Sequence, residues 1–276
     1  MKKFIINLIK VFIVIFVVSC SNQKKSDTNK NDINLNLKNM YSEAMNELEK
    51  GNYEEAQIIF TEIKLKFPLT NESIQSQIMI GFIEYSNLNY DTAILQFDRV
   101  IKKYPSHKNI DYVYYMKALS YYEQINKETL DGNNNIQALD SFNQILNRFP
   151  QSKYAKDSEQ KIILVKEIMA AKHMDIGFFY LNQKKYLAAL NRFKKVIDEY
   201  STSKFTPEAL HRLIEIYSTL GMKKDAEKTL AVLGYNYPKS KWYEFSYELV
   251  FPDTKKENNF SFNKLLNLFE KNEQEK

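Results

Sequence analysis

The feature that most constrains the fold of this chain is a recurring pattern of three residues at fixed distances from one another. An alanine is followed four residues later by a large apolar residue and twelve residues later by a proline. Only six prolines occur among the 276 residues, so chance would rarely place four of them at one offset. The copies are Ala56, Phe60 and Pro68; Ala93, Phe97 and Pro105; Ala138, Phe142 and Pro150; and Ala226, Leu230 and Pro238, with a fifth, Ala189 and Phe193, that has Ser201 at the proline position.

Each position of this pattern has a physical reason in a pair of antiparallel helices. Small residues at the alanine position and twelve residues before it let two helices cross closely, while the large apolar residue fills the space to the next pair. Proline lacks a backbone N–H and cannot continue a helix, so it ends the second one. Gly51 and Gly221 fall five residues before the alanine, where a turn needs positive φ. The earlier small residues are Ala44, Gly81 and Gly177.

This pattern resembles the tetratricopeptide repeat. The resemblance implies an all-α fold, a right-handed superhelical solenoid of about five helix hairpins. The alanines are 37, 45, 51 and 37 residues apart, so the array is expanded in its middle. We expect an insertion over residues 127–134 to lengthen a loop in the third hairpin. Apolar residues at helical spacing between Asp157 and Lys172 predict lengthened helices before the fourth.

The repeat array is expected to occupy residues 38–250, with a capping helix between Lys239 and Val250. Residues 251–276 should form a charged tail that contains a possible short helix, Phe260–Phe269. Residues 20–37 carry few large apolar side chains, so they cannot bury enough surface to offset the entropy of ordering. We expect them to be a disordered tether with a reach of roughly 20 to 25 Å.

The first 19 residues have the composition of a cleavable signal peptide. Three lysines and no acid accompany an apolar run that ends at Val18 and Ser19,. Eight apolar residues span about 12 Å as a helix, so a permanent transmembrane helix is the weaker alternative. The site resembles the bacterial lipobox, which implies cleavage before Cys20, a lipid on that cysteine, and sorting to the outer membrane because Ser21 follows. Cleavage would lower the formal charge from +5 to +2. Such a balance argues against nucleic-acid binding.

Three longer stretches are similar to the BamD family, the tetratricopeptide lipoproteins of the outer-membrane β-barrel assembly (Bam) machine. They read PSHKNIDYVYYMKAL at residues 105–119, FPQSKYAKDS at 149–158 and EALHRL at 208–213. The resemblance implies a scaffold that faces the periplasm, docks on a periplasmic domain of BamA, and works with other Bam lipoproteins and unfolded outer-membrane proteins. Arg192 matches the family arginine that takes part in the BamA contact, and its guanidinium suits pairing with a carboxylate.

The resemblance also implies that the first repeats capture unfolded substrates. On the repeat template, seven aromatic and methionine residues face a concave groove, where they could bind apolar segments. The alternative is that they pack as core between helices. These residues are Tyr41, Met45, Phe82, Tyr85, Tyr112, Tyr115 and Tyr122. Pro105, His107, Asn109 and Asp111 form the family's signature loop, or alternatively a hydrogen-bonded turn between repeats.

A catalytic function finds little support in the sequence. The three histidines, His107, His173 and His211, lie in different repeats, and no glycine-rich phosphate loop is present. Paired acids such as Glu54 and Glu55 suit a helix start. We therefore expect no enzyme, no cofactor and no metal site. The alternative function is a tetratricopeptide lipoprotein that coordinates cell division or peptidoglycan synthesis, but no heptad segment precedes the repeats, as such proteins usually have.

Overall fold

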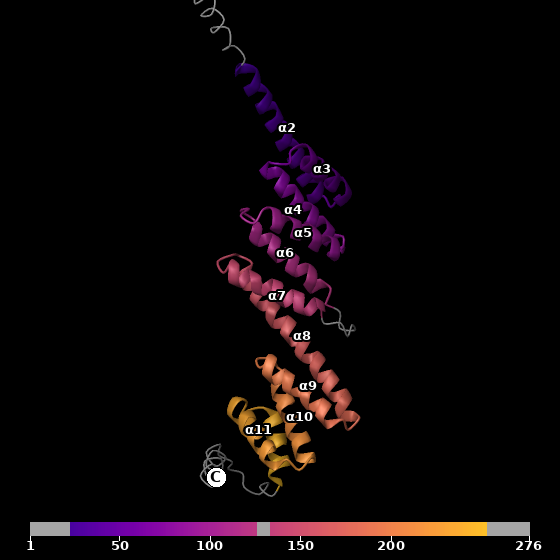
Figure 1. Ribbon diagram of the computed structural model, residues 1–276, viewed down its shortest axis with the longest axis vertical. Helices are drawn as coiled ribbons and strands as arrows, with labels where there is room; N and C mark the ends of the chain where they lie inside the picture. The colour runs from indigo at the N-terminus through magenta and orange to yellow at the C-terminus, as the bar shows by residue number, and fades with distance from the viewer. Residues whose placement is uncertain (1–22, 126–132, 253–276) are drawn as a thin grey trace, which may run out of the picture. The chain divides into compact units, whose positions relative to one another are not determined.

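The computed structural model describes residues 23–125 and 133–252, which form helices and no strand (Figure 1). The chain divides into two compact units, residues 1–123 and 124–276. The first unit holds α2 (Gln23–Glu49), α3 (Tyr53–Lys66), α4 (Asn71–Ser86), α5 (Tyr90–Lys103) and α6 (Ile110–Glu123). The second unit holds α7 (Asn133–Arg148), α8 (Ala155–Asn182), α9 (Tyr186–Glu199), α10 (Thr206–Thr219), α11 (Lys223–Asn236) and α12 (Lys241–Val250).

The recurring apolar residue is the centre of each local core. Phe60, Phe97, Phe142, Phe193 and Leu230 all have a fully buried side chain. Burial of a side chain of this size contributes roughly 1.5 to 3 kcal/mol. The sequence prediction that this position fills the space within the array is therefore confirmed.

The small residues permit the close helix crossings that the pattern predicts. A Cβ placed on Gly81 would lie 2.6 Å from the ring of Phe97, and one on Gly177 would lie 2.6 Å from Phe193. No real side chain tolerates such a distance, so only glycine lets α4 approach α5 and α8 approach α9 in this way. Ala44 is fully buried at the corresponding crossing of α2 and α3.

Four hairpin turns share one backbone conformation. Gly51 and Gly221 have φ of 82° and 74°, as predicted. Leu88 and Lys184 occupy the same place in their hairpins and also have positive φ, 62° and 58°. In each turn the next residue donates its N–H to a carbonyl five residues back, as Asn89 does to Glu84 at 2.9 Å. This is the Schellman closure of a helix end, which requires a left-handed residue.

The second helix of a hairpin ends at an aromatic residue, with or without proline. Phe67, Tyr104, Tyr200 and Tyr237 follow α3, α5, α9 and α11, with φ between −128° and −135°. Each donates its N–H to the carbonyl four residues back. Because α9 ends in this way before Ser201, proline reinforces the helix end but is not required for it.

The array closes with α12, which packs against α10 and α11. The helix expected from Lys239 begins at Lys241, because the Ser240 side chain caps it by accepting from the Trp242 N–H at 3.2 Å. His211 Nδ1 lies 2.8 Å from Ser246 Oγ, and both side chains are buried. The guanidinium of Arg212 lies 5.2 Å from the Trp242 ring. These contacts join α12 to α10.

The structure differs from the sequence analysis at the N-terminal segment. Residues 23–37 were expected to be a disordered tether, but α2 begins at Gln23 and the described side chains include a buried Leu37. A helix anchored in a packed hairpin extends outward because each added residue gains a backbone hydrogen bond after the nucleus has formed. The repeat array therefore starts before residue 38.

Several expectations concern residues outside the described ranges. They include the signal peptide over 1–19, Cys20, most of the insertion, and the short helix at 260–269. Of the insertion, Asn133 and Asn134 are described, and they begin α7 as helical residues. None of the helices within residues 23–125 and 133–252 has the length and apolar character needed to cross a membrane.

Candidate functional site

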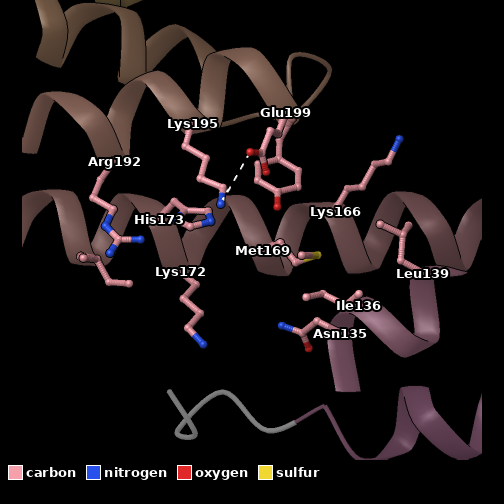
Figure 2. A pocket seen from close by; sticks show the side chains of 12 residues that line it. Asn135, Ile136, Leu139, Lys166, Met169, Lys172, His173, Arg192, Lys195 and Glu199 are labelled. Carbon is pink, nitrogen blue, oxygen red and sulfur yellow. Dashed lines mark ion pairs between the residues drawn. The ribbon is translucent and has the colours of Figure 1, made fainter. Parts of the chain in front are cut away.

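A groove of about 620 Å³ runs between α7, α8 and α9 in the second unit (Figure 2). We call it the basic groove. Its lining residues come from three helices: Asn135, Ile136 and Leu139 from α7; Lys166, Met169, Lys172, His173 and Ile176 from α8; and Arg192, Lys195, Glu199 and Tyr200 from α9 and its end. It is the place where the structure puts Arg192.

Helical periodicity explains why these side chains share one groove. On α8 the lining positions recur every three or four residues, and on α9 Arg192, Lys195 and Glu199 do the same. Residues at this spacing form one stripe along a helix. The close crossing of α8 and α9 at Gly177 brings the two stripes together, and apolar side chains such as Met169 and Leu139 line the same groove.

The groove carries an excess of positive charge. Four of its lining residues are lysine or arginine, and only Glu199 is acidic. Lys195 Nζ lies 3.6 Å from Glu199 Oε1, and both side chains are substantially exposed. Such an exposed pair contributes little to stability. Arg192 is half-buried and forms no ion pair within the described part of the chain. Its guanidinium remains available for an external carboxylate.

The pKa of His173 depends on the charges that line the groove. Burial lowers its pKa below the ordinary value of 6.5, and the nearby Lys195 and Arg192 lower it further. The ring stacks on Tyr200 with centroids 5.9 Å apart. Its Nδ1 is buried and makes no hydrogen bond in the described structure. His173 is thus neutral at pH 7 because of burial and the cations around it.

The seven residues expected in the concave groove lie on the first helices of hairpins in the first unit. These helices adjoin, since α2 contacts α4 and α4 contacts α6. We call the seven residues the aromatic row. All seven are half-buried, neither enclosed in the core nor fully exposed. They therefore contribute to packing and to the surface: Tyr41, Met45, Phe82, Tyr85, Tyr112, Tyr115 and Tyr122.

Two tyrosines of the aromatic row show how this dual role arises. The Tyr41 ring meets the buried Phe60 edge to face, with centroids 5.8 Å apart. Burial and the Glu72 carboxylate raise the pKa of Tyr41. Burial, Glu123 and Tyr90 raise the pKa of Tyr85 to about 12. In both cases the ring packs while the hydroxyl lies close to a carboxylate on the next first helix.

The signature loop joins α5 to α6 by local hydrogen bonds. His107 donates its N–H to the Tyr104 carbonyl at 3.1 Å, and its Nδ1 accepts from the Asn109 N–H at 3.2 Å. Asp111 lies in the first turn of α6, while Pro105 directly follows the aromatic end of α5. The pKa of His107 is lowered by burial and by Lys108. These are the contacts of a turn between repeats.

Sequence reasoning found Arg192 but missed the residues around it. Neither the lysines of α8 nor His173 stood out, because their common surface forms only where three helices meet. Periodicity would have placed Lys166 and His173 on one face of α8, seven residues apart. It could not show that α9 presents Arg192 to that face. In the described ranges no cluster of three or more histidine, cysteine or acidic residues could hold a metal ion.

Comparison with known proteins identifies the family. The family described as outer membrane lipoprotein YfiO matches residues 34–233. The outer membrane protein assembly factor BamD of Rickettsia prowazekii is 39% identical over 243 residues, which are 88% of this chain and 96% of that protein. The chain belongs to the BamD family. The BamD of Caulobacter vibrioides is also 39% identical, over 76% of this chain and 69% of that protein. That of Neisseria meningitidis is 29% identical, over 74% and 80%.

The family match covers both surfaces described above. Residues 34–233 include the whole aromatic row and every residue that lines the basic groove. Cys20 and the closing helix α12 lie outside the matched range. The chain is thus a tetratricopeptide protein of the BamD family of outer membrane protein assembly factors, and both candidate surfaces lie within the part that it shares with the family profile.

Proposed function

We propose that this protein is a lipid-anchored scaffold of the outer-membrane β-barrel assembly machine that docks on the periplasmic part of BamA. The position of Arg192 supports this docking. It lies on the wall of the basic groove, half-buried, with no ion pair in the described structure. A guanidinium held in this way is suited to a bidentate bond with a carboxylate of the partner.

The aromatic row supports a second part of the proposal, the delivery of unfolded outer-membrane proteins. Its rings are fixed on one side by packing and accessible on the other. Rigid aromatic side chains bind apolar segments with a small loss of conformational entropy. In this proposal the first unit receives substrates, while the second unit holds the barrel-forming subunit. Other Bam lipoproteins are further proposed partners.

A lipid on Cys20 would hold the scaffold at the periplasmic face of the outer membrane. Cleavage before Cys20 would leave two residues between the lipid and Gln23, where α2 begins. The outer part of α2, residues 23–36, would then hold the anchor about 20 Å from the packed array, on a helix instead of a flexible tether,. Two neighbouring membrane attachments, the lipid and the partner, would strengthen each other through a high effective concentration.

Affinity purification from membranes tests the docking proposal. The wild-type chain should recover BamA. Arg192→Glu should reduce that recovery by about ten-fold or more, because the ion pair between Arg192 and a carboxylate of the partner becomes a repulsion between two carboxylates. The control is Lys194→Glu, which makes the same charge change at an exposed neighbour that does not line the groove. Circular dichroism should show the same helix content in all three proteins.

The alternative function predicts a different set of partners. A protein that coordinates cell division or peptidoglycan synthesis would recover peptidoglycan synthases and no BamA. Equal BamA recovery by Arg192→Glu and by wild type would remove Arg192 from the docking surface. Replacement of Cys20 by alanine should release the chain from membranes of cells, and continued membrane association in the absence of BamA would contradict the lipid anchor.

A further inference from the structure

The basic groove has a shape and a composition that exceed what one arginine needs. Its cations stand on two walls, Lys166 and Lys172 on α8 and Arg192 and Lys195 on α9. Apolar side chains also line the groove: Met169 on α8, and Leu139 and Ile136 on α7, the last of which is 55% exposed. A ligand that satisfies all of these groups must carry several negative charges and an apolar part.

The spacing of the cations favours an extended ligand over a compact anion. Lys166 and Lys172 are six residues apart on α8, and Arg192 and Lys195 are three residues apart on α9. Six residues of helix correspond to about 9 Å. An extended peptide advances about 3.3 Å per residue, so a segment of about three to four residues would follow the groove. A single phosphate would reach only one end of it.

We propose that the basic groove binds an extended acidic segment of a partner protein, with carboxylates on Arg192, Lys195 and Lys166 and an apolar side chain on Met169 and Leu139. Lys195 would exchange its exposed partner Glu199 for a carboxylate of the ligand. This inference rests on the proposed function, because it names the chemistry of the partner surface that meets Arg192. The choice of partner would then depend on three cations from two helices, α8 and α9.

The position of His173 gives this groove a dependence on pH. The groups that face it are Lys172 and Lys166 on α8, Arg192, Lys195, Glu199 and Tyr200 on α9, and Asn135 on α7. In the free protein burial, and after it the nearby Lys195 and Arg192, lower the pKa of the imidazole. Carboxylates bound to those cations would remove the repulsion and favour the protonated ring. Binding should then take up a proton, so affinity should rise as the pH falls.

The test measures the affinity of the full mature chain, in detergent, for the purified periplasmic part of BamA by isothermal titration. Lys195→Gln and Lys166→Gln should each weaken binding about three- to ten-fold, as loss of a partly exposed charge pair does. Met169→Ala should weaken it to a smaller extent. Lys194→Gln, the matched control outside the groove, should bind as wild type does. Melting temperatures show whether each variant remains folded.

The outcomes separate this inference from the proposed function. If Arg192→Glu binds weakly while Lys195→Gln, Lys166→Gln and Met169→Ala bind as wild type does, the partner is confirmed and the groove is not its site. If the wild-type chain does not bind at all, both proposals fail. Displacement of the bound domain by about 10 mM inorganic phosphate, with no effect of Met169→Ala, would indicate a compact anion site and overturn the peptide assignment.

The role of His173 has its own measurement. Between about pH 8 and about pH 6 the wild-type affinity should increase several-fold, and the imidazole resonance of His173 should show a higher pKa in the complex than in the free chain. His173→Asn, which keeps a polar side chain but does not titrate, should bind with no such increase. An equal pH dependence in His173→Asn would show that the proton is taken up elsewhere.

Discussion

The aromatic row and the basic groove are two surfaces built on the same repeat by different means. The row uses the first helices of hairpins in residues 23–123. All of its residues are half-buried, and Tyr41 and Met45 pack against the local core. The groove uses α7, α8 and α9, and its long basic side chains extend from α8 and α9, whose buried faces contain Met174 and Phe193. The comparison teaches that the repeat core sets positions, while half-buried residues beside it set the chemistry of each surface.

The largest expected effect is a loss of stability when the glycine at a helix crossing is replaced, and it can be compared between the two units. Gly177→Val should destabilise the chain by about 3 kcal/mol, because the added side chain meets the Phe193 ring beneath the basic groove,. Gly81→Val should have a similar effect at Phe97 in the first unit. Urea unfolding followed by tyrosine fluorescence and circular dichroism measures both. A change below about 1 kcal/mol would show that the helices separate easily at these crossings.

Salt should distinguish the surfaces next. An increase from about 0.05 M to about 0.5 M salt should weaken binding of the BamA domain by about ten-fold, because the groove acts through charges that salt screens. Binding of an unfolded outer-membrane protein to the aromatic row should change by less than about three-fold, since apolar contact dominates there. Fluorescence anisotropy with each labelled ligand measures both curves. Parallel curves would mean that one kind of interaction governs both surfaces.

Alkaline pH offers a comparison between one tyrosine of each surface. Burial and neighbouring acids raise the pKa values of Tyr85 and Tyr200 to about 12. Between pH 10 and 12 the unfolded chain releases these protons while the folded chain keeps them, so stability falls as the pH rises. Tyr85→Phe and Tyr200→Phe should each reduce the slope of unfolding free energy against pH in that window. An unchanged slope in either variant would contradict the raised pKa at that site.

The smallest expected effect concerns turns that carry a side chain where other turns have glycine. Leu88→Gly, in the first unit, and Lys184→Gly, between α8 and α9, should each stabilise the chain by up to about 1 kcal/mol, because glycine adopts positive φ without strain,. Gly51→Ala is the reverse control and should destabilise it by about the same amount,. Thermal melting measures all three. A lower melting temperature for Leu88→Gly would show that the exposed leucine makes a stabilising contact.

Much of the fold was predictable because it depends on local spacing. Ala56 and Phe60 lie one turn apart, so their burial follows from helical geometry alone, and Gly51 marks a turn by its own conformational freedom,. The turns at Leu88 and Lys184 were not predicted, because neither residue prefers positive φ and the surrounding hairpin imposes it. The aromatic residue at the end of each second helix was a signal in the sequence that the proline pattern obscured.

The sequence by itself determined the repeat, the family and the position of Arg192, since each depends on residues close together in the chain. Only the tertiary structure decided what surrounds Arg192. His173 and Lys166 lie on α8, and Leu139 lies on α7, yet all of them line the groove that Arg192 enters. The physical reason is that a helix specifies which side chains share its face, whereas the crossing of helices at small residues decides which faces meet.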